Sequence, residues 1–119
     1  MARYRLSQSA QSDIDAVLAW SHDTFGSAAR RRYQGLIAAA IRDIASDPYR
    51  AGSRPRPDLG EGIRAWHLML SRDRSRADHV RRPRHVLFYR WDDGIVVVGR
   101  VLHDAMDVAR YTGTPDAWD

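Results

Sequence analysis

Apolar residues recur at helical spacing early in the chain, after one short extended segment. Residues 3–6 are predicted to form a strand, and Ser7 or Ser9 can cap the helix that follows. One face of this helix is apolar or small, at Ala10, Ile14, Val17, Leu18 and Ser21. Asp13 and Asp15 fall outside that face, where early aspartates suit the positive end of a helix.

A second helix is predicted directly after the first. Gly26 is expected to end the first helix, because glycine accepts the left-handed conformation of a C-terminal cap. Ser27 is expected to cap the second helix and Pro48 to end it. Its apolar stripe is the clearest in the chain, at Ala29, Tyr33, Leu36, Ile37, Ala40, Ile41 and Ile44. The short connection predicts that the two helices pack as an antiparallel hairpin.

The middle of the chain changes between loop and strand character. Residues 49–62 are rich in glycine, proline and arginine and are predicted to form a loop. Residues 63–70 are predicted to form a strand with Trp66 on one side and His67 on the other. Residues 71–83 are highly polar, rich in arginine and without an apolar period, so we expect an exposed loop there.

The last part of the chain predicts a β-hairpin. Runs of β-branched and aromatic residues at 85–91 and 95–102 are joined at Asp93-Gly94, a strong turn signal. Residues 104–119 are expected to hold one helical turn and then a tail at 108–119. The predicted order is β-α-α-β-β-β. It indicates an α+β sandwich of two layers, an antiparallel sheet on a helical hairpin, with the first strand paired to the sheet.

Length and composition narrow the class of protein. Residues 1–119 suffice for a single domain, and hydrophobic residues make up 44% of the chain. The longest apolar run, residues 36–41, is far shorter than the ~20 residues that a membrane span needs. The first residues lack the apolar region of a secretory signal, and cysteine is absent. We therefore expect a cytoplasmic protein that does not associate with membranes.

The basic residues are all arginine, nineteen of them, and the net charge is +4. This charge favours an anionic partner, which could be an acidic protein as easily as a nucleic acid. The arginines of the basic loop from Arg72 to Arg84 could contact phosphate, but a solvated surface is favoured, because charge runs often form surface that binds nothing. No aromatic residue is interleaved there, so base stacking from this loop is not expected. The five histidines are dispersed, and no nucleophile or phosphate-loop motif is present. We expect neither a metal nor a cofactor.

One group of candidate functional residues lies on or at the ends of adjacent predicted strands. Arg64, Arg90, Arg100 and His103 could bind phosphate, or supply an acid and an electrostatic stabiliser for RNA cleavage, if they converge. The alternative is a set of ordinary surface ion pairs, and both remain open. Large rings that could line a groove for a partner segment are Trp20, Phe25, Trp66, Tyr89 and Trp91.

Four segments carry a recognisable pattern. They are Leu6-Ser7 with Ala10, Asp13-Ile14 and Trp20; Tyr33, Leu36, Ile44-Ala45, Pro48 and Gly52; His85 to Arg90 with Asp92 to Ile95; and Arg100 to His103 with Met106-Asp107. In this order they resemble the ParE branch of the RelE/ParE superfamily of bacterial toxins. The resemblance implies a type II toxin that inhibits DNA gyrase without catalysis. It also implies a small ParD-like antitoxin that wraps around the toxin and neutralises it.

The related RelE branch supplies the alternative, a ribosome-dependent messenger RNA endoribonuclease. That branch uses basic residues with a late tyrosine or a His–Tyr pair. Here lysine is absent and Asp104 follows His103, which departs from the pattern. The residues that could still serve are Arg64, Arg84, His103 and Tyr111.

The gyrase hypothesis assigns residues to two surfaces. We expect antitoxin binding at Trp20, Tyr33, Ile37, Ile41, Arg64 and Arg90. Arg–carboxylate bonds would add specificity to that contact. We expect toxicity to depend on the end segment, at Arg100, His103, Met106 and Asp107.

Overall fold

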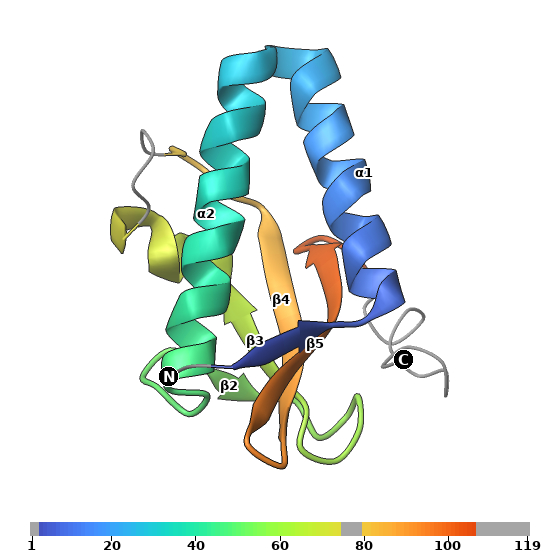
Figure 1. Cartoon of the computed structure of the whole chain (residues 1–119), viewed down its shortest axis with the longest axis vertical. Coiled ribbons are helices and arrows are strands. Elements are labelled where there is room, and N and C mark those ends of the chain that lie inside the picture. Colours follow the sequence, from blue (N-terminus) through green and yellow to red (C-terminus); the bar gives the residue numbers. More distant parts are fainter. Residues whose placement is uncertain (1–2, 75–79, 107–119) are drawn as a thin grey trace.

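The helices and strands follow the predicted order, with two additions. The computed structural model describes residues 3–74 and 80–106. The elements are β1 (Tyr4–Leu6), α1 (Gln8–Phe25), α2 (Ser27–Ser46), β2 (Arg54–Pro55), β3 (Arg64–His67), the 3₁₀ helix η1 (Leu68–Arg74), β4 (His85–Asp92) and β5 (Ile95–His103). Figure 1 shows the helical hairpin packed on one face of the sheet, with its turn at the opposite end of the molecule from the β4–β5 turn. The predicted α+β sandwich is confirmed.

The sheet has five strands in the order β1-β5-β4-β3-β2. The meander of β3, β4 and β5 is antiparallel, as predicted. β1 pairs with β5 in parallel, with Tyr4 beside Val96 and Leu6 beside Val98. The sheet is therefore mixed at this edge.

Apolar side chains pack on both faces of the sheet. The larger cluster lies between the helices and the sheet. It contains the predicted stripe of α2 except Ala29, together with Trp66, Leu87 and Tyr89. A smaller cluster lies on the other face, where Leu59 and Ile63 of a loop cover strand residues. The strand residues of this smaller cluster are Phe88, Val97 and Leu102.

Ser7 joins the start of α1 to the edge of β5. Its hydroxyl accepts a hydrogen bond from the Ala10 backbone N–H at 2.9 Å, so Ser7 is the cap of α1 and Ser9 lies inside the helix. The same hydroxyl donates to the Gly99 carbonyl at 2.7 Å, and the Ser7 N–H donates to the Val98 carbonyl at 2.9 Å. A fully buried serine thus satisfies backbone groups of a strand and of a helix together.

Asp13 continues this contact along β5, beyond the end of β1. Its carboxylate accepts a hydrogen bond from the Val101 N–H at 2.9 Å. The Arg100 guanidinium donates to both carboxylate oxygens, at 2.7 and 2.8 Å, in a bidentate pair. The Asp13 and Arg100 side chains are only 15% and 18% exposed. Asp13 therefore does more than favour the start of a helix: it covers an edge that β1 leaves unpaired.

The register of β4 and β5 shifts at this place. Phe88 lies opposite Arg100, but the next residue, Tyr89, lies opposite Val98. Gly99 is left over, which is the definition of a β-bulge. The Gly99 carbonyl is the group that Ser7 binds, so the irregular part of β5 is held by the first turns of α1.

A single residue, Gly26, joins the two helices. Its φ of +95° is unfavourable for other residues, and its N–H donates to the His22 carbonyl at 2.8 Å. The prediction that Gly26 ends α1 is confirmed. The prediction that Ser27 caps α2 is wrong, because Ser27 is already the first helical residue and Gly26 occupies the cap position without a side-chain hydrogen bond. The junction is too short to hold a separate capping residue.

The segment after β3 differs from the predicted strand and exposed loop. β3 ends at His67, and residues 68–74 form η1. Ser71 is fully buried. Its hydroxyl accepts from the Trp66 indole N–H at 2.9 Å and donates to Asp43 at 2.6 Å. Arg74 also binds Asp43, at 2.9 Å. The buried Asp43 carboxylate needs these partners, and they draw the start of the predicted loop against α2.

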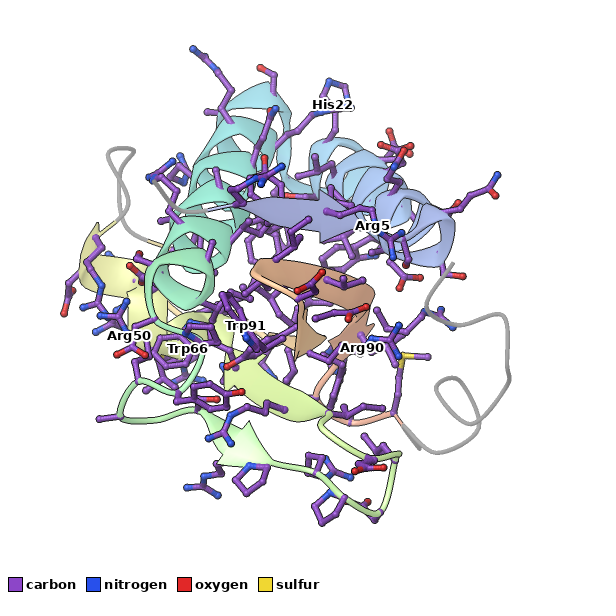
Figure 2. All side chains as sticks on the ribbon, turned by 60° about the horizontal axis from the view of Figure 1, so that its bottom comes forward. Arg5, His22, Arg50, Trp66, Arg90 and Trp91 are labelled. Atoms are coloured by element: carbon purple, nitrogen blue, oxygen red, sulfur yellow. The ribbon has the colours of Figure 1, made fainter. Side chains whose placement is uncertain are left out.

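Two further details concern the predicted loop at residues 49–62. It contains the short strand β2, which pairs Arg54 with Ala65. Arg50, just after the end of α2, lies over the Trp66 ring at 5.5 Å (Figure 2). Its guanidinium also forms an ion pair with Asp43. These contacts attach the loop to the sheet, and they could not be predicted from the spacing of apolar residues.

We predict that Asp13→Ala lowers the free energy of unfolding by roughly 2–3 kcal/mol, because it removes the carboxylate that the Arg100 guanidinium and the Val101 N–H bind. Asp13→Asn should have a smaller effect, since it keeps an acceptor and removes the charge. Urea denaturation measures both. Asp15→Ala, at an exposed aspartate of the same helix, is the matched control. Equal losses at positions 13 and 15 would contradict the proposed role.

Candidate functional site

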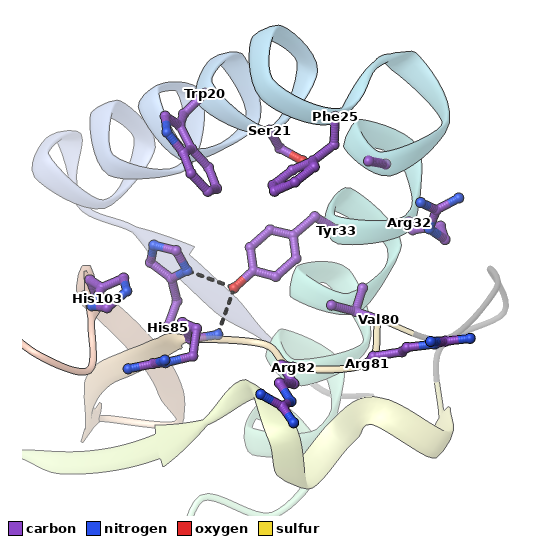
Figure 3. A pocket seen from close by; sticks show the side chains of 12 residues that line it. Trp20, Ser21, Phe25, Arg32, Tyr33, Val80, Arg81, Arg82, His85 and His103 are labelled. Carbon is purple, nitrogen blue, oxygen red and sulfur yellow. Dashed lines mark hydrogen bonds between the residues drawn. The ribbon is translucent and has the colours of Figure 1, made fainter.

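A groove of about 760 Å³ opens between the Gly26 end of the helical hairpin and the segment that leads into β4. Side chains from both helices, from residues 80–85 and from the end of β5 form its walls (Figure 3). The lining residues are Trp20, Ser21, Phe25, Ala29, Arg32, Tyr33, Val80, Arg81, Arg82, Arg84, His85 and His103. Large concave sites of this kind are the default candidates for binding.

Trp20 and Phe25 form one wall of the groove. They are 57% and 66% exposed, although both are large and aromatic. Their rings meet edge to face, with centroids 5.6 Å apart. Both come from the second half of α1, near its junction with α2 (Figure 3). Exposed rings that support each other in this way are typical of a surface kept for a partner.

Tyr33 and His85 form the floor of the groove. The Tyr33 hydroxyl lies 2.6 Å from His85 Nδ1, and it accepts from the Arg84 backbone N–H at 3.2 Å. Burial raises the pKa of Tyr33 to about 12. Burial, and then the nearby His103, lowers the pKa of His85 to about 4. Both side chains are therefore neutral at pH 7. The arrangement that satisfies them has Tyr33 donating to Nδ1 of His85, which places the His85 proton on Nε2.

Asp104 connects the ends of β3, β4 and β5 beside this floor. Its carboxylate accepts from the Arg84 guanidinium at 3.0 Å and lies 3.1 Å from His67 Nε2. The Arg84 hydrogen bond is the main reason that the pKa of Asp104 is lowered to about 2. His103, the residue before it, lies opposite His85 in the sheet, with ring centroids 5.4 Å apart. Asp104 thus keeps Arg84 and the two strand ends in a fixed arrangement.

The rim of the groove is positively charged. Arg32 comes from α2, and Arg81 and Arg82 come from the segment that leads into β4. None of these three guanidiniums forms an ion pair with another residue in the described ranges, 3–74 and 80–106. Among the described residues, no carboxylate lines the groove. The groove therefore suits an anionic or electron-rich occupant.

The residues predicted to bind an antitoxin occupy different places. Trp20 and Tyr33 line the groove, whereas Ile37 and Ile41 are buried in the core, at 4% and 6% exposed. The two isoleucines can shape a binding surface from behind but offer little area for contact.

The two arginines of that set lie away from the groove. Arg64 binds Ser53 and lies over the Tyr49 ring at 5.0 Å. Arg64 is opposite Tyr89 in the sheet, so Arg90 points to the other face, where it lies near Asp92.

The predicted toxicity segment is also divided. Arg100 is held in the bidentate pair with Asp13, which gives it a structural role. His103 lines the groove, and Met106 packs on the smaller apolar cluster. Asp107 lies outside the described residues, as does Tyr111. The structure brings Arg84 and His103 of the alternative catalytic set together beside Asp104 but places Arg64 elsewhere.

Several residues of the groove were missed or underrated by sequence reasoning. His85 and Arg32 were not singled out, and Arg81 and Arg82 were assigned to a solvated loop. Counting outward from the Asp93-Gly94 turn would place His85 opposite Leu102, and the bulge at Gly99 moves that partner to His103. The hairpin pattern alone would have placed His85 and His103 near each other, but their direct pairing could not be predicted without knowledge of the bulge.

The described part of the chain also lacks two other classes of feature. No group of three or more histidine, aspartate or glutamate side chains there could hold a metal ion. No described helix is long and apolar enough to cross a membrane.

Comparison with known proteins gives one result. Residues 4–108 match the sequence profile of the family described as the ParE toxin of type II toxin–antitoxin system, parDE. The match covers all the described elements, including those that form the groove. A search against curated proteins found no match.

We predict that the free energy of unfolding falls by about 1–2 kcal/mol as the pH drops from about 6.5 to 4, because of His85. The unfolded chain binds a proton at His85 near its ordinary pKa of 6.5, whereas the folded protein does so only near a pKa of about 4. The contribution of neutral His85 to the free energy of unfolding is therefore fully present above pH 6.5, and it is lost progressively as the pH falls toward 4. The amount is less than the full shift implies, because His85 is partly exposed.

Urea denaturation at intervals between pH 4 and 7 measures this dependence. His85→Gln should flatten it, whereas His22→Gln should not. His22 is an exposed histidine at the far tip of the helical hairpin (Figure 2). The same slope in the wild type and in His85→Gln would show that the pH dependence arises elsewhere.

Proposed function

Because the chain belongs to the ParE toxin family of type II toxin–antitoxin systems, we propose that it inhibits DNA gyrase by binding and catalyses no reaction itself. The family match over residues 4–108 carries this proposal. We place its action in the cytoplasm, in line with a chain that has no cysteine.

The chemistry of the groove supports binding over catalysis. A general acid or base works best with a pKa near the pH at which it operates. Tyr33, with a pKa of about 12, and His85, with a pKa of about 4, are both far from neutrality, and they are bonded to each other. Arg84 is engaged by Asp104. These contacts build a rigid, neutral floor, which suits recognition of a partner.

We further propose that a ParD-like antitoxin neutralises the toxin by wrapping around it. The positions predicted for this contact support an extended partner, because Trp20 lies at the groove while Arg64 and Arg90 lie on β3 and β4, on opposite faces of the sheet. A compact partner could not reach all three. Arginine side chains at these places would pair with carboxylates of the antitoxin.

The RelE-type endoribonuclease remains the alternative, with less support. Its predicted set, Arg64, Arg84 and His103, is not gathered at one place. Mapping of transcripts in toxin-arrested cells distinguishes the two proposals. Cuts within translated codons that disappear with His103→Ala would favour the ribonuclease, and intact transcripts would favour gyrase inhibition.

The direct test uses purified toxin and gyrase. We expect inhibition of supercoiling and accumulation of cleaved DNA at micromolar toxin, because binding at the enzyme would hold the broken intermediate. The same reactions with the antitoxin added first should show neither effect. Unchanged supercoiling and cleavage at micromolar toxin would rule out gyrase as the target.

A further inference from the structure

We propose that the groove binds a short single-stranded stretch of nucleic acid, with bases stacked on Trp20 and Phe25 and phosphates held by the arginines of the rim. This goes beyond the inhibition of gyrase and the binding of an antitoxin, and it does not depend on either. The fold brings together rings and arginines that are distant in the sequence. The rings come from α1, and the arginines come from α2 and residues 81–84 (Figure 3).

The ring wall supplies the stacking surface. Trp20 and Phe25 are more exposed than any other tryptophan or phenylalanine side chain in the described residues. In their edge-to-face contact one ring edge meets one ring face, and at 57% and 66% exposed both residues still present ring surface to an occupant. Every base has a flat π-face, so stacking on such rings tolerates many sequences.

The rim supplies the phosphate contacts. Arg32 comes from α2, and Arg81 and Arg82 come from the segment that leads into β4, without ion pairs among the described residues. Guanidinium forks match phosphate oxygens in two parallel hydrogen bonds. A strand that runs along the groove would meet cations from two segments of the chain, with the rings of Trp20 and Phe25 as one wall. This is the arrangement of an electrostatic channel with a stacking platform.

The floor supplies hydrogen-bonding groups for base edges. With Tyr33 bound to Nδ1 of His85, the Nε2–H of His85 remains as a donor. The neighbouring His103 offers a second imidazole, 41% exposed. The pKa of His85, lowered by burial to about 4, keeps that ring neutral, so it would recognise a base rather than compete with the rim for phosphate.

The lining favours a nucleic acid over a helical peptide. Five of the twelve lining residues are aromatic or imidazole rings and four are arginines, whereas the aliphatic members are only Ala29 and Val80. Grooves that accept amphipathic helices offer an apolar surface for large aliphatic anchors. A volume of about 760 Å³ accommodates only a short stretch, so a longer strand would extend beyond the groove.

Fluorescence anisotropy of a labelled oligothymidylate of about twelve nucleotides tests the proposal with the full-length protein. We expect binding near micromolar at ~50 mM salt, with affinity that falls as salt rises. Trp20→Ala with Phe25→Ala should weaken binding at least about tenfold. Arg81→Ala with Arg82→Ala should weaken it and reduce the salt slope by about 1.4, or 0.7 for each phosphate contact.

Matched controls separate the groove from general surface effects. Trp91→Ala removes a tryptophan that is 44% exposed at the end of β4, outside the groove, and should leave binding unchanged. Arg54→Ala removes an exposed arginine of β2 and should change binding little. Urea denaturation of each variant confirms folding. A blunt duplex of the same length should bind at least several-fold more weakly, because paired bases cannot reach the rings.

Four results would overturn the proposal. They are no binding of oligothymidylate at low salt, equal losses for the Trp20→Ala with Phe25→Ala variant and for Trp91→Ala, a duplex that binds as tightly as the single strand, and binding only of an acidic amphipathic peptide at the same residues. Oligouridylate in parallel identifies the source of the strand, since tighter binding of either oligomer assigns the groove to RNA or to DNA. Failure here leaves gyrase inhibition intact, because that assay does not use these oligomers.

Discussion

The bidentate contact between Asp13 and Arg100, with the Val101 N–H on the same carboxylate, is the interaction on which the groove depends. β1 is too short to cover the whole edge of β5, and Ser7 and Asp13 of the chain's first turns take over where it ends. They hold the bulge at Gly99. Because a shift of one residue exchanges the two faces of a strand, this bulge decides that His103, rather than Leu102, faces His85.

The second helix contributes in a similar way through two buried polar groups on its inner face. Tyr33 binds the start of β4 through Arg84 and His85, and Asp43 binds η1 through Ser71 and Arg74. Each of these two side chains holds against α2 a segment whose sequence has no regular apolar spacing. The walls of the groove are thus positioned by hydrogen bonds from a helix whose sequence pattern indicates only an apolar stripe.

Much of the fold could be predicted, because its main elements are periodic. The stripe of α2, the glycine at the helix junction and the Asp93-Gly94 turn indicate structure through local residues alone. β2 and η1 could not be predicted, since they are short and stabilised by distant partners such as Tyr89 for Ser53 and Asp43 for Ser71. The candidate site was predicted least well. Ile37 and Ile41 continue the core, while Arg81 and Trp20 become neighbours across the groove only in three dimensions.

The single-residue junction at Gly26 has a consequence for the width of the groove. Trp20 and Phe25 precede it within α1, and Arg32 and Tyr33 follow it within α2. An added side chain would meet no atom within 4 Å there, so the requirement for glycine comes from its torsion angle of +95° and not from crowding. The φ angle of Gly26 therefore fixes how far apart the residues of α1 and α2 that line the groove lie. A larger residue would fit in the available space, but it would disfavour this φ angle and so change the distance between the two walls.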